Sequence, residues 1–181
     1  MLKAINNKVL LILLLLATLL VLVSAPVLGD ITFRHAIYGK ELDLSKAKKG
    51  EETEAVKHFK ETGENLYNDD EEAWRSGYDQ FSTSCGGCHG HHAGGKLGPS
   101  LVDDYWTYTT AKTDKGLFEI LYGGARAQMG PNWGSLTIDE MLKIMSWLRA
   151  AYQGDPSDAD WMTAKEQKNF DPIPVDYFDD K

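Results

Sequence analysis

The chain has 181 residues and carries 27 acidic residues against 19 lysines and arginines, a net charge of −8 at neutral pH. This length suits one domain with a leader and hardly two domains. The acidic balance excludes a general nucleic-acid-binding function, because phosphate binding depends on Lys and Arg. An acidic surface suits a basic protein partner instead, with an attraction that weakens as salt rises.

The first 29 residues are predicted to be a secretory signal peptide. Lys3 and Lys8 supply the positive start, Val9–Val23 is an apolar run of 15 residues, and small residues with a proline follow up to Gly29. The run is shorter than the roughly 20 residues that a membrane-spanning helix needs. Cleavage after Ala25 or Gly29 fits the pattern, and an uncleaved anchor is the alternative. Because this segment holds two lysines and no acid, the exported remainder has a net charge of −10, and we expect it in the periplasm.

The remainder is predicted to be all-α. Four stretches have helical spacing of apolar residues or helix start and stop signals, and they cover residues 51–62, 71–83, 114–122 and 137–152. Asn68 or Asp69 is expected to cap the second, while Thr137 and Glu140 make a capping box for the last. Residues 30–50 are expected to form a short strand or an extended arm, and the acidic tail after Phe170 is expected to be irregular.

Gly77 lies inside the predicted helix 71–83, where it costs about 1 kcal/mol relative to alanine. A second helix that crosses at close range would justify this cost. The helix predicted for residues 137–152 is the natural partner.

The only two cysteines, Cys85 and Cys88, stand in a Cys-x-x-Cys-His pattern that ends at His89. Two thiols at this spacing reach the two vinyl groups of one haem, and the histidine that follows offers a nitrogen to the iron. A zinc site would need more cysteines, or would crowd His91 or His92 into the same turn. A thioredoxin-like dithiol would want a βαβ setting, and a disulfide across this gap would be strained. The motif therefore predicts one covalently attached haem.

Met129 is the predicted sixth ligand of the iron. A haem that only transfers electrons is usually closed by Met or His, and Met raises its potential. Met129 lies in a turn-rich stretch, 123–131, whose glycines and proline let a loop hold a thioether close to the macrocycle. Met141 and Met145 lie on the apolar stripe of residues 137–152 and are expected in the core. The alternative for Met129 is a side chain that fills a gap under a loop.

Pro99 lies ten residues after His89, in the sequence Gly-Pro-Ser-Leu. A haem-ligating histidine needs an acceptor for its other ring nitrogen. The carbonyl oxygen of Pro99 is a candidate for that acceptor. A simple turn is the alternative, and the spacing alone does not choose between them.

Taken together, the helix, the haem motif, Gly-Pro-x-Leu, the Met-Gly-Pro loop and the closing helix resemble class I cytochromes c. Further strings are similar to cytochrome c-L, and the resemblance extends over nearly all of residues 31–170. These sequence strings are Phe33-Arg34-His35, Leu42-Asp43-Leu44-Ser45, Cys88-His89-Gly90-His91, Asp104-Tyr105-Trp106-Thr107-Tyr108, Gly116-Leu117-Phe118, Gly123-Gly124-Ala125, Met129-Gly130-Pro131 and Asp139-Glu140-Met141-Leu142.

The resemblance implies a class I cytochrome c-like fold with extensions around one haem c. The chain is then expected to divide into a signal peptide (1–29), an N-terminal extension (30–70), a cytochrome c domain (71–155) and a C-terminal extension (156–181). The family match also implies thioethers at Cys85 and Cys88 and axial ligands at His89 and Met129. A calcium ion near the haem propionates stays open, with no ligand assigned.

The function that the resemblance implies is electron transfer without enzymatic activity. Cytochrome c-L accepts electrons from periplasmic methanol dehydrogenase, which carries pyrroloquinoline quinone (PQQ), and passes them to a smaller cytochrome c. We expect the same partners here, and a monomer. A small haem peroxidase is an alternative that needs an open iron position, and a ligand-sensing or structural haem module is a third. Two positions depart from the family: Thr109 stands where proline is common, and Ala127 where glycine is common.

Overall fold

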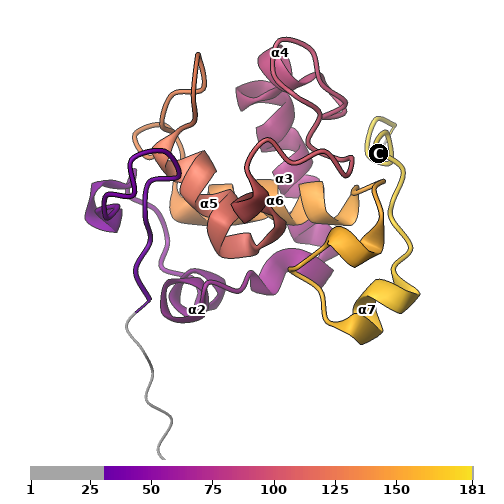
Figure 1. The fold of residues 1–181 in the computed structure, drawn as a ribbon, viewed down its shortest axis with the longest axis horizontal. Helices are drawn as coiled ribbons and strands as arrows, with labels where there is room; N and C mark the ends of the chain where they lie inside the picture. The colour runs from indigo at the N-terminus through magenta and orange to yellow at the C-terminus, as the bar shows by residue number, and fades with distance from the viewer. Residues whose placement is uncertain (1–30, 181) are drawn as a thin grey trace, which may run out of the picture. The chain divides into compact units, whose positions relative to one another are not determined.

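All regular secondary structure in residues 31–180, which this computed structural model describes, is helical (Figure 1). The predicted all-α class is confirmed. The predicted signal peptide lies outside the described residues. Within them, the arm before the first helix contains a single bridge, Arg34 to Glu41, and no strand. None of the helices in the described part is long and apolar enough to cross a membrane.

Six α-helices follow the arm in the described residues. They are α2 (Glu54–Thr62), α3 (Glu71–Ser84), α4 (Gly86–His89), α5 (Asp114–Gly123), α6 (Ile138–Ala150) and α7 (Ala164–Asn169). Short 3-10 turns cover Leu44–Lys46, Leu66–Asp69, Thr109–Lys112 and Pro156–Asp158. The four predicted helices correspond to α2, α3, α5 and α6, whereas the sequence interpretation missed α7.

Local capping explains where these helices begin. Thr137 and Glu140 form the predicted capping box of α6. Helix α2 begins three residues later than predicted because the Thr53 side chain accepts a hydrogen bond from its first turn. The predicted caps of α3 are wrong. Asp69 belongs to the preceding 3-10 turn, and Asp70 instead accepts from the backbone N–H groups of residues 72 and 73.

Helices α3 and α6 make the most extensive contact between two elements, and they cross at the centre of the fold (Figure 1). The crossing is close at Gly77, where an added Cβ atom would lie 1.9 Å from the carbonyl oxygen of Lys143. The predicted close approach is therefore confirmed. It allows Phe81 on α3 to pack against Trp147 on α6, with ring centroids 4.8 Å apart.

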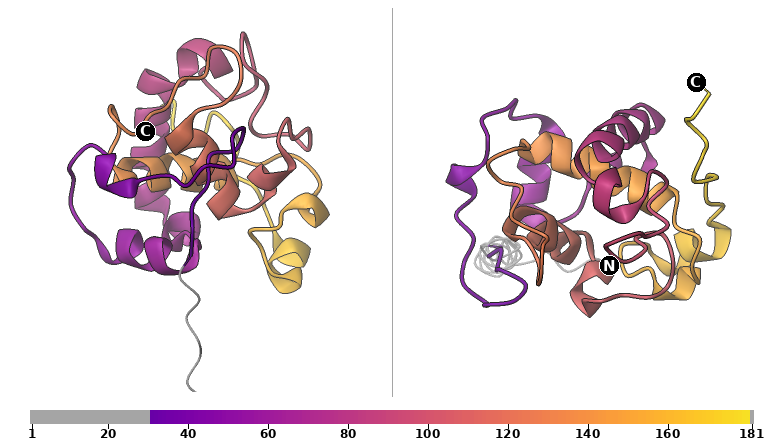
Figure 2. Two further views of the ribbon diagram at one scale, coloured as in Figure 1. Left: turned by 60° about the vertical axis from the view of Figure 1, so that its left-hand side comes forward. Right: turned by 90° about the horizontal axis from the view of Figure 1, so that it is seen from above.

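The N-terminal arm is fixed to the helices by an aromatic cluster. Phe33 stacks on Phe59 of α2 at 5.4 Å and meets Phe118 of α5 edge-on at the same distance. The backbone N–H of Arg34 donates to the Glu119 carboxylate at 2.7 Å. The arm thus lies beside α5 (Figure 2) and contributes to the same core.

Replacing Gly77 with alanine tests the crossing. We expect Gly77→Ala to lower the free energy of unfolding by about 3 kcal/mol, at the upper end of overpacking costs, because the new methyl group meets backbone that cannot rotate away. This loss exceeds the gain of about 1 kcal/mol in helix propensity. Urea denaturation of the haem-loaded protein measures the difference.

Gly134→Ala is the matched control. A Cβ atom at Gly134 would have no neighbour within 4 Å, so the change should stay within about 0.5 kcal/mol. Equal denaturation midpoints for the two variants would show that α3 and α6 are not in close contact at Gly77.

Candidate functional site

One cavity of about 720 Å³ opens above the crossing of α3 and α6. Its volume lies within the range of about 300–1,000 Å³ that is usual for cofactor sites. Side chains of α3, α5 and α6 and of the loop after α4 form an apolar wall, which includes Phe81, Leu101, Leu117, Leu121, Ile144 and Leu148. The sequence-predicted residues Cys85, Cys88, His89, Pro99 and Met129 all line this cavity.

The two cysteines and His89 are brought together by one helical turn. Cys85 ends α3 and begins α4, so Cys88 and His89 follow it at the spacings of three and four residues that share a helix face. The two cysteines do not form a disulfide with each other, and Cys88 is exposed. Burial raises the pKa of the Cys85 thiol to about 11, and the neighbouring Cys88 adds to the shift. This is the opposite of the lowered pKa of a thioredoxin-like dithiol.

His89 is buried, and only one of its two ring nitrogens remains available to bind a ligand or metal. Its Nδ1 atom lies 2.9 Å from the carbonyl oxygen of Pro99. A carbonyl oxygen only accepts, so Nδ1 carries the proton and Nε2 keeps a free lone pair. Gly98 permits this arrangement, because an added Cβ atom would lie 2.6 Å from the imidazole ring.

Met129 lies half-buried at the cavity, in the loop between α5 and α6. The loop is closed by a hydrogen bond of 2.9 Å from the backbone N–H of Ala125 to the carbonyl oxygen of Met129. The Asn132 side chain fastens it to the last turn of α5, donating to the Leu121 carbonyl oxygen at 2.9 Å. Met141 and Met145 are fully buried on α6, and Met145 also lines the cavity.

Sequence reasoning missed the polar residues of the cavity. Trp106 lines it, and the buried Nε1 atom of Trp106 has no hydrogen-bond partner among the described residues. Arg126, exposed on the same cavity, lies in the loop that carries Met129. These two side chains offer donors where a cofactor could present carboxylates. The string that contains Trp106 carried the family resemblance, but its spacing gave no hint of this role.

A buried ion pair supports the wall behind Trp106. The Arg149 Nε atom donates to Asp114 at 3.0 Å, and the other carboxylate oxygen of Asp114 accepts from Asn68 at 2.7 Å. The guanidinium carbon lies 3.8 Å from the ring centroid of Trp161 and 5.7 Å from that of Trp106. Burial lowers the pKa of Arg149, and the contact with Asp114 opposes this shift. The pair joins α5 to α6.

These residues fit a covalently bound haem. The wall is broad and apolar, one imidazole has a free Nε2 lone pair, a thioether and two thiols line the same cavity, and an unpaired indole N–H is available for a carboxylate. Imidazole and thioether are the usual pair in c-type cytochromes that transfer electrons.

Comparison with known proteins identifies the family. The chain is 49% identical over 150 residues to cytochrome c-L of Methylorubrum extorquens. This alignment covers 82% of this chain and 76% of that protein. The chain belongs to the cytochrome c-L family. It is therefore a monohaem c-type cytochrome with a covalently bound haem, and an electron-transfer protein rather than an enzyme.

Solved structures of cytochrome c-L have the same fold. That from the marine methylotrophic bacterium Methylophaga aminisulfidivorans is 56% identical, with a TM-score of 0.77, over 81% of this chain and 99% of that one. That from Hyphomicrobium denitrificans is 41% identical, with a TM-score of 0.74, over 83% and 91%. A family model described as cytochrome c oxidase, cbb3-type, subunit III matches residues 72–148, the part that contains the cavity. The class I cytochrome c-like fold is thereby confirmed.

Ala127, one of the two departures from the family pattern, has a left-handed backbone with a φ angle of 61°. This conformation costs an L-residue about 1–2 kcal/mol and is free of strain for glycine. The glycine common in relatives therefore suits the backbone of the Met129 loop better than the alanine found here.

We expect Ala127→Gly to raise the free energy of unfolding by about 0.5–1 kcal/mol, because relief of the strain exceeds the extra backbone entropy of glycine. Ala125→Gly, in the same loop but without a positive φ angle, should instead lower it by about 0.5–1 kcal/mol. Denaturation curves of the two haem-loaded variants test the opposite signs. Destabilisation by both substitutions would contradict a strained Ala127.

Proposed function

We propose that Cys85 and Cys88 would attach the haem through thioethers and that His89 and Met129 would bind its iron. The observation that carries this proposal is that one cavity is lined by all four side chains. We also propose a division of the chain into four parts. In chain order these are a signal peptide (1–29), an N-terminal extension (30–70), a haem-binding part (71–155) and a C-terminal extension (156–181).

When bound, a haem with these ligands supplies an iron centre that gains and loses one electron. The residues around it would hold its ligands in place during that change. Pro99 holds the His89 imidazole in one orientation through Nδ1, and the closed loop keeps Met129 at the cavity. The apolar wall would keep water away from the bound group. Trp106 and Arg126 are proposed to hold the propionates.

The proposed role is that of a periplasmic electron carrier in methylotrophic metabolism. Electrons would come from PQQ-dependent methanol dehydrogenase and leave to a smaller cytochrome c. Family membership supports this, since all three relatives described above are cytochromes c-L and one of them comes from a methylotrophic bacterium. The net charge of −10 after the signal peptide supports attraction to a basic partner surface.

Substitution of three methionines tests the iron ligand. Met129→Ala should remove the long-wavelength absorption band of a Met-ligated ferric haem, lower the reduction potential and let cyanide bind readily. Met145→Ala and Met141→Ala should keep the band, and each should destabilise the protein by about 2–5 kcal/mol because both side chains are fully buried. Loss of the band in Met145→Ala, with its retention in Met129→Ala, would move the ligand to α6.

A coupled assay tests the partner. Reduced methanol dehydrogenase mixed with the oxidised cytochrome should reduce the haem rapidly, and the rate should fall by about tenfold or more as ionic strength rises. The same mixture without methanol is the control. Absence of reduction at any ionic strength would rule out this dehydrogenase as partner and would leave the haem attachment unaffected.

A further inference from the structure

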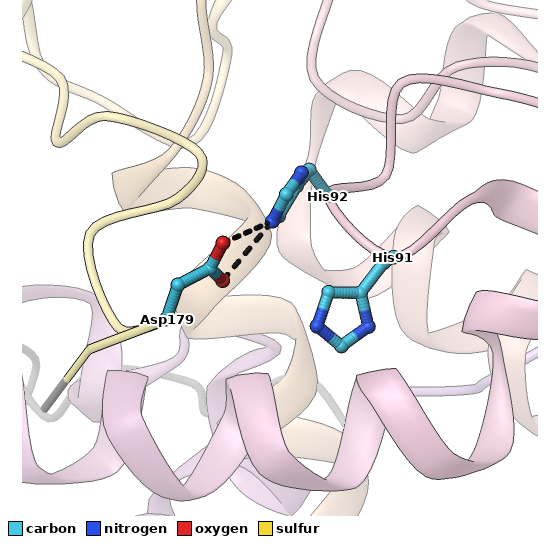
Figure 3. A group of neighbouring side chains, drawn as sticks. All are labelled: His91, His92 and Asp179. Carbon is cyan, nitrogen blue, oxygen red and sulfur yellow. Dashed lines mark hydrogen bonds and ion pairs between the residues drawn. The ribbon is translucent and has the colours of Figure 1, made fainter.

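Two histidines outside the haem cavity meet an aspartate from the C-terminal segment. His91 and His92 lie in the loop after α4, and Asp179 follows His92 by 87 positions in the chain. The Nε2 atom of His92 is 2.9 and 3.0 Å from the two carboxylate oxygens of Asp179 (Figure 3). One ligating atom from each of the three side chains lies within 4.8 Å of the others.

We propose that His91, His92 and Asp179 form a Zn²⁺ site that fastens the C-terminal segment to the loop after the haem attachment motif. Two imidazoles and one carboxylate are ligands that zinc accepts, and a water molecule completes the tetrahedron. Calcium and magnesium prefer sites made of oxygen atoms. The site is distinct from the haem cavity, because none of the three residues lines it.

The geometry needs a small contraction. Zinc–ligand bonds of about 2.0–2.1 Å put tetrahedral ligand atoms roughly 3.3 Å apart. His92 and Asp179 are already near this separation. His91 and Asp179 are exposed and His92 is half-buried, so rotations of exposed side chains bring in the third ligand without moving the core.

Tyr78 supports both ends of the site. Its hydroxyl donates a short hydrogen bond to Asp179, and its oxygen lies 2.8 Å from Nε2 of His91. Nε2 is the nitrogen of His91 that lies on the side of Asp179 (Figure 3), and it would leave the tyrosine oxygen to bind the metal. Tyr78 is itself buried and packs on Trp147 at 5.2 Å.

Contacts outside the cluster also hold the C-terminal segment at the site, so little ordering remains to oppose binding. Phe178 is buried, and the guanidinium carbon of Arg75 lies 5.4 Å from the centre of its ring. The Tyr177 hydroxyl donates to Glu71 of α3 at 2.9 Å. These contacts bring the yellow C-terminal segment beside the loop after α4 (Figure 1).

Calorimetric titration of ZnCl₂ into the tag-free, haem-loaded protein tests the site. One equivalent should bind. Asp179→Asn and His92→Gln should each weaken zinc binding by about 100-fold. Removing a residue that only supports a metal ligand costs about 10- to 100-fold in affinity, and losing a ligand itself should cost at least as much as the upper end of that range. Bound zinc should also slow hydrogen exchange of the amides in residues 173–180.

Asp180→Asn and His58→Gln are matched controls, since they remove a neighbouring carboxylate and an unrelated histidine, and both should bind as the parent does. The visible spectrum reports that the haem domain is intact in every variant. Absence of stoichiometric binding, or equal affinity in Asp179→Asn and His92→Gln, would reduce the cluster to a hydrogen-bonded contact. Unchanged hydrogen exchange would refute the fastening role. None of these outcomes bears on electron transfer.

Discussion

The close crossing of α3 and α6 at Gly77 is the constraint on which the haem site depends. With no side chain at this position, the backbone of α3 rests against the Lys143 carbonyl of α6. The same approach packs Phe81 on Trp147. Cys85 follows Phe81 by one helical turn, and its backbone N–H donates a hydrogen bond to the Phe81 carbonyl oxygen. The start of the attachment motif is therefore fixed relative to α6, whose side chains form part of the cavity wall.

The rest of the cavity is completed by two loops that have little regular structure. One carries Pro99 and Trp106, and the other carries Met129. Each is held by a specific hydrogen bond: His89 with the Pro99 carbonyl, and Asn132 with the end of α5. A rigid helical crossing thus supplies the wall and the attachment turn, while anchored loops supply groups that must approach the cofactor from other directions.

The sequence predicted what is encoded locally. The capping box at Thr137 and the attachment motif depend on residues within one turn of each other, and the cost of a glycine inside a helix pointed to the crossing at Gly77. Helix α7 was missed although Thr163 and Glu166 form a capping box of the same kind, because its few residues bury no apolar stripe. The contact of His92 with Asp179 was out of reach, since nothing local relates residues 87 positions apart.

Burial of Arg149 explains why residues before 71 and after 155 contribute to the wall of the haem cavity. A buried guanidinium is tolerated only when its charge is paired and its donors are used. Asp114 pairs with it, Asn68 donates to the same carboxylate, and Trp161 covers the face of the guanidinium group. Removing residues 30–70 or residues 156–181 would leave part of this ion pair open to water or unsatisfied. Because the pair lies behind Trp106, the effect would reach the cavity wall, and residues 71–155 alone would not reproduce the site.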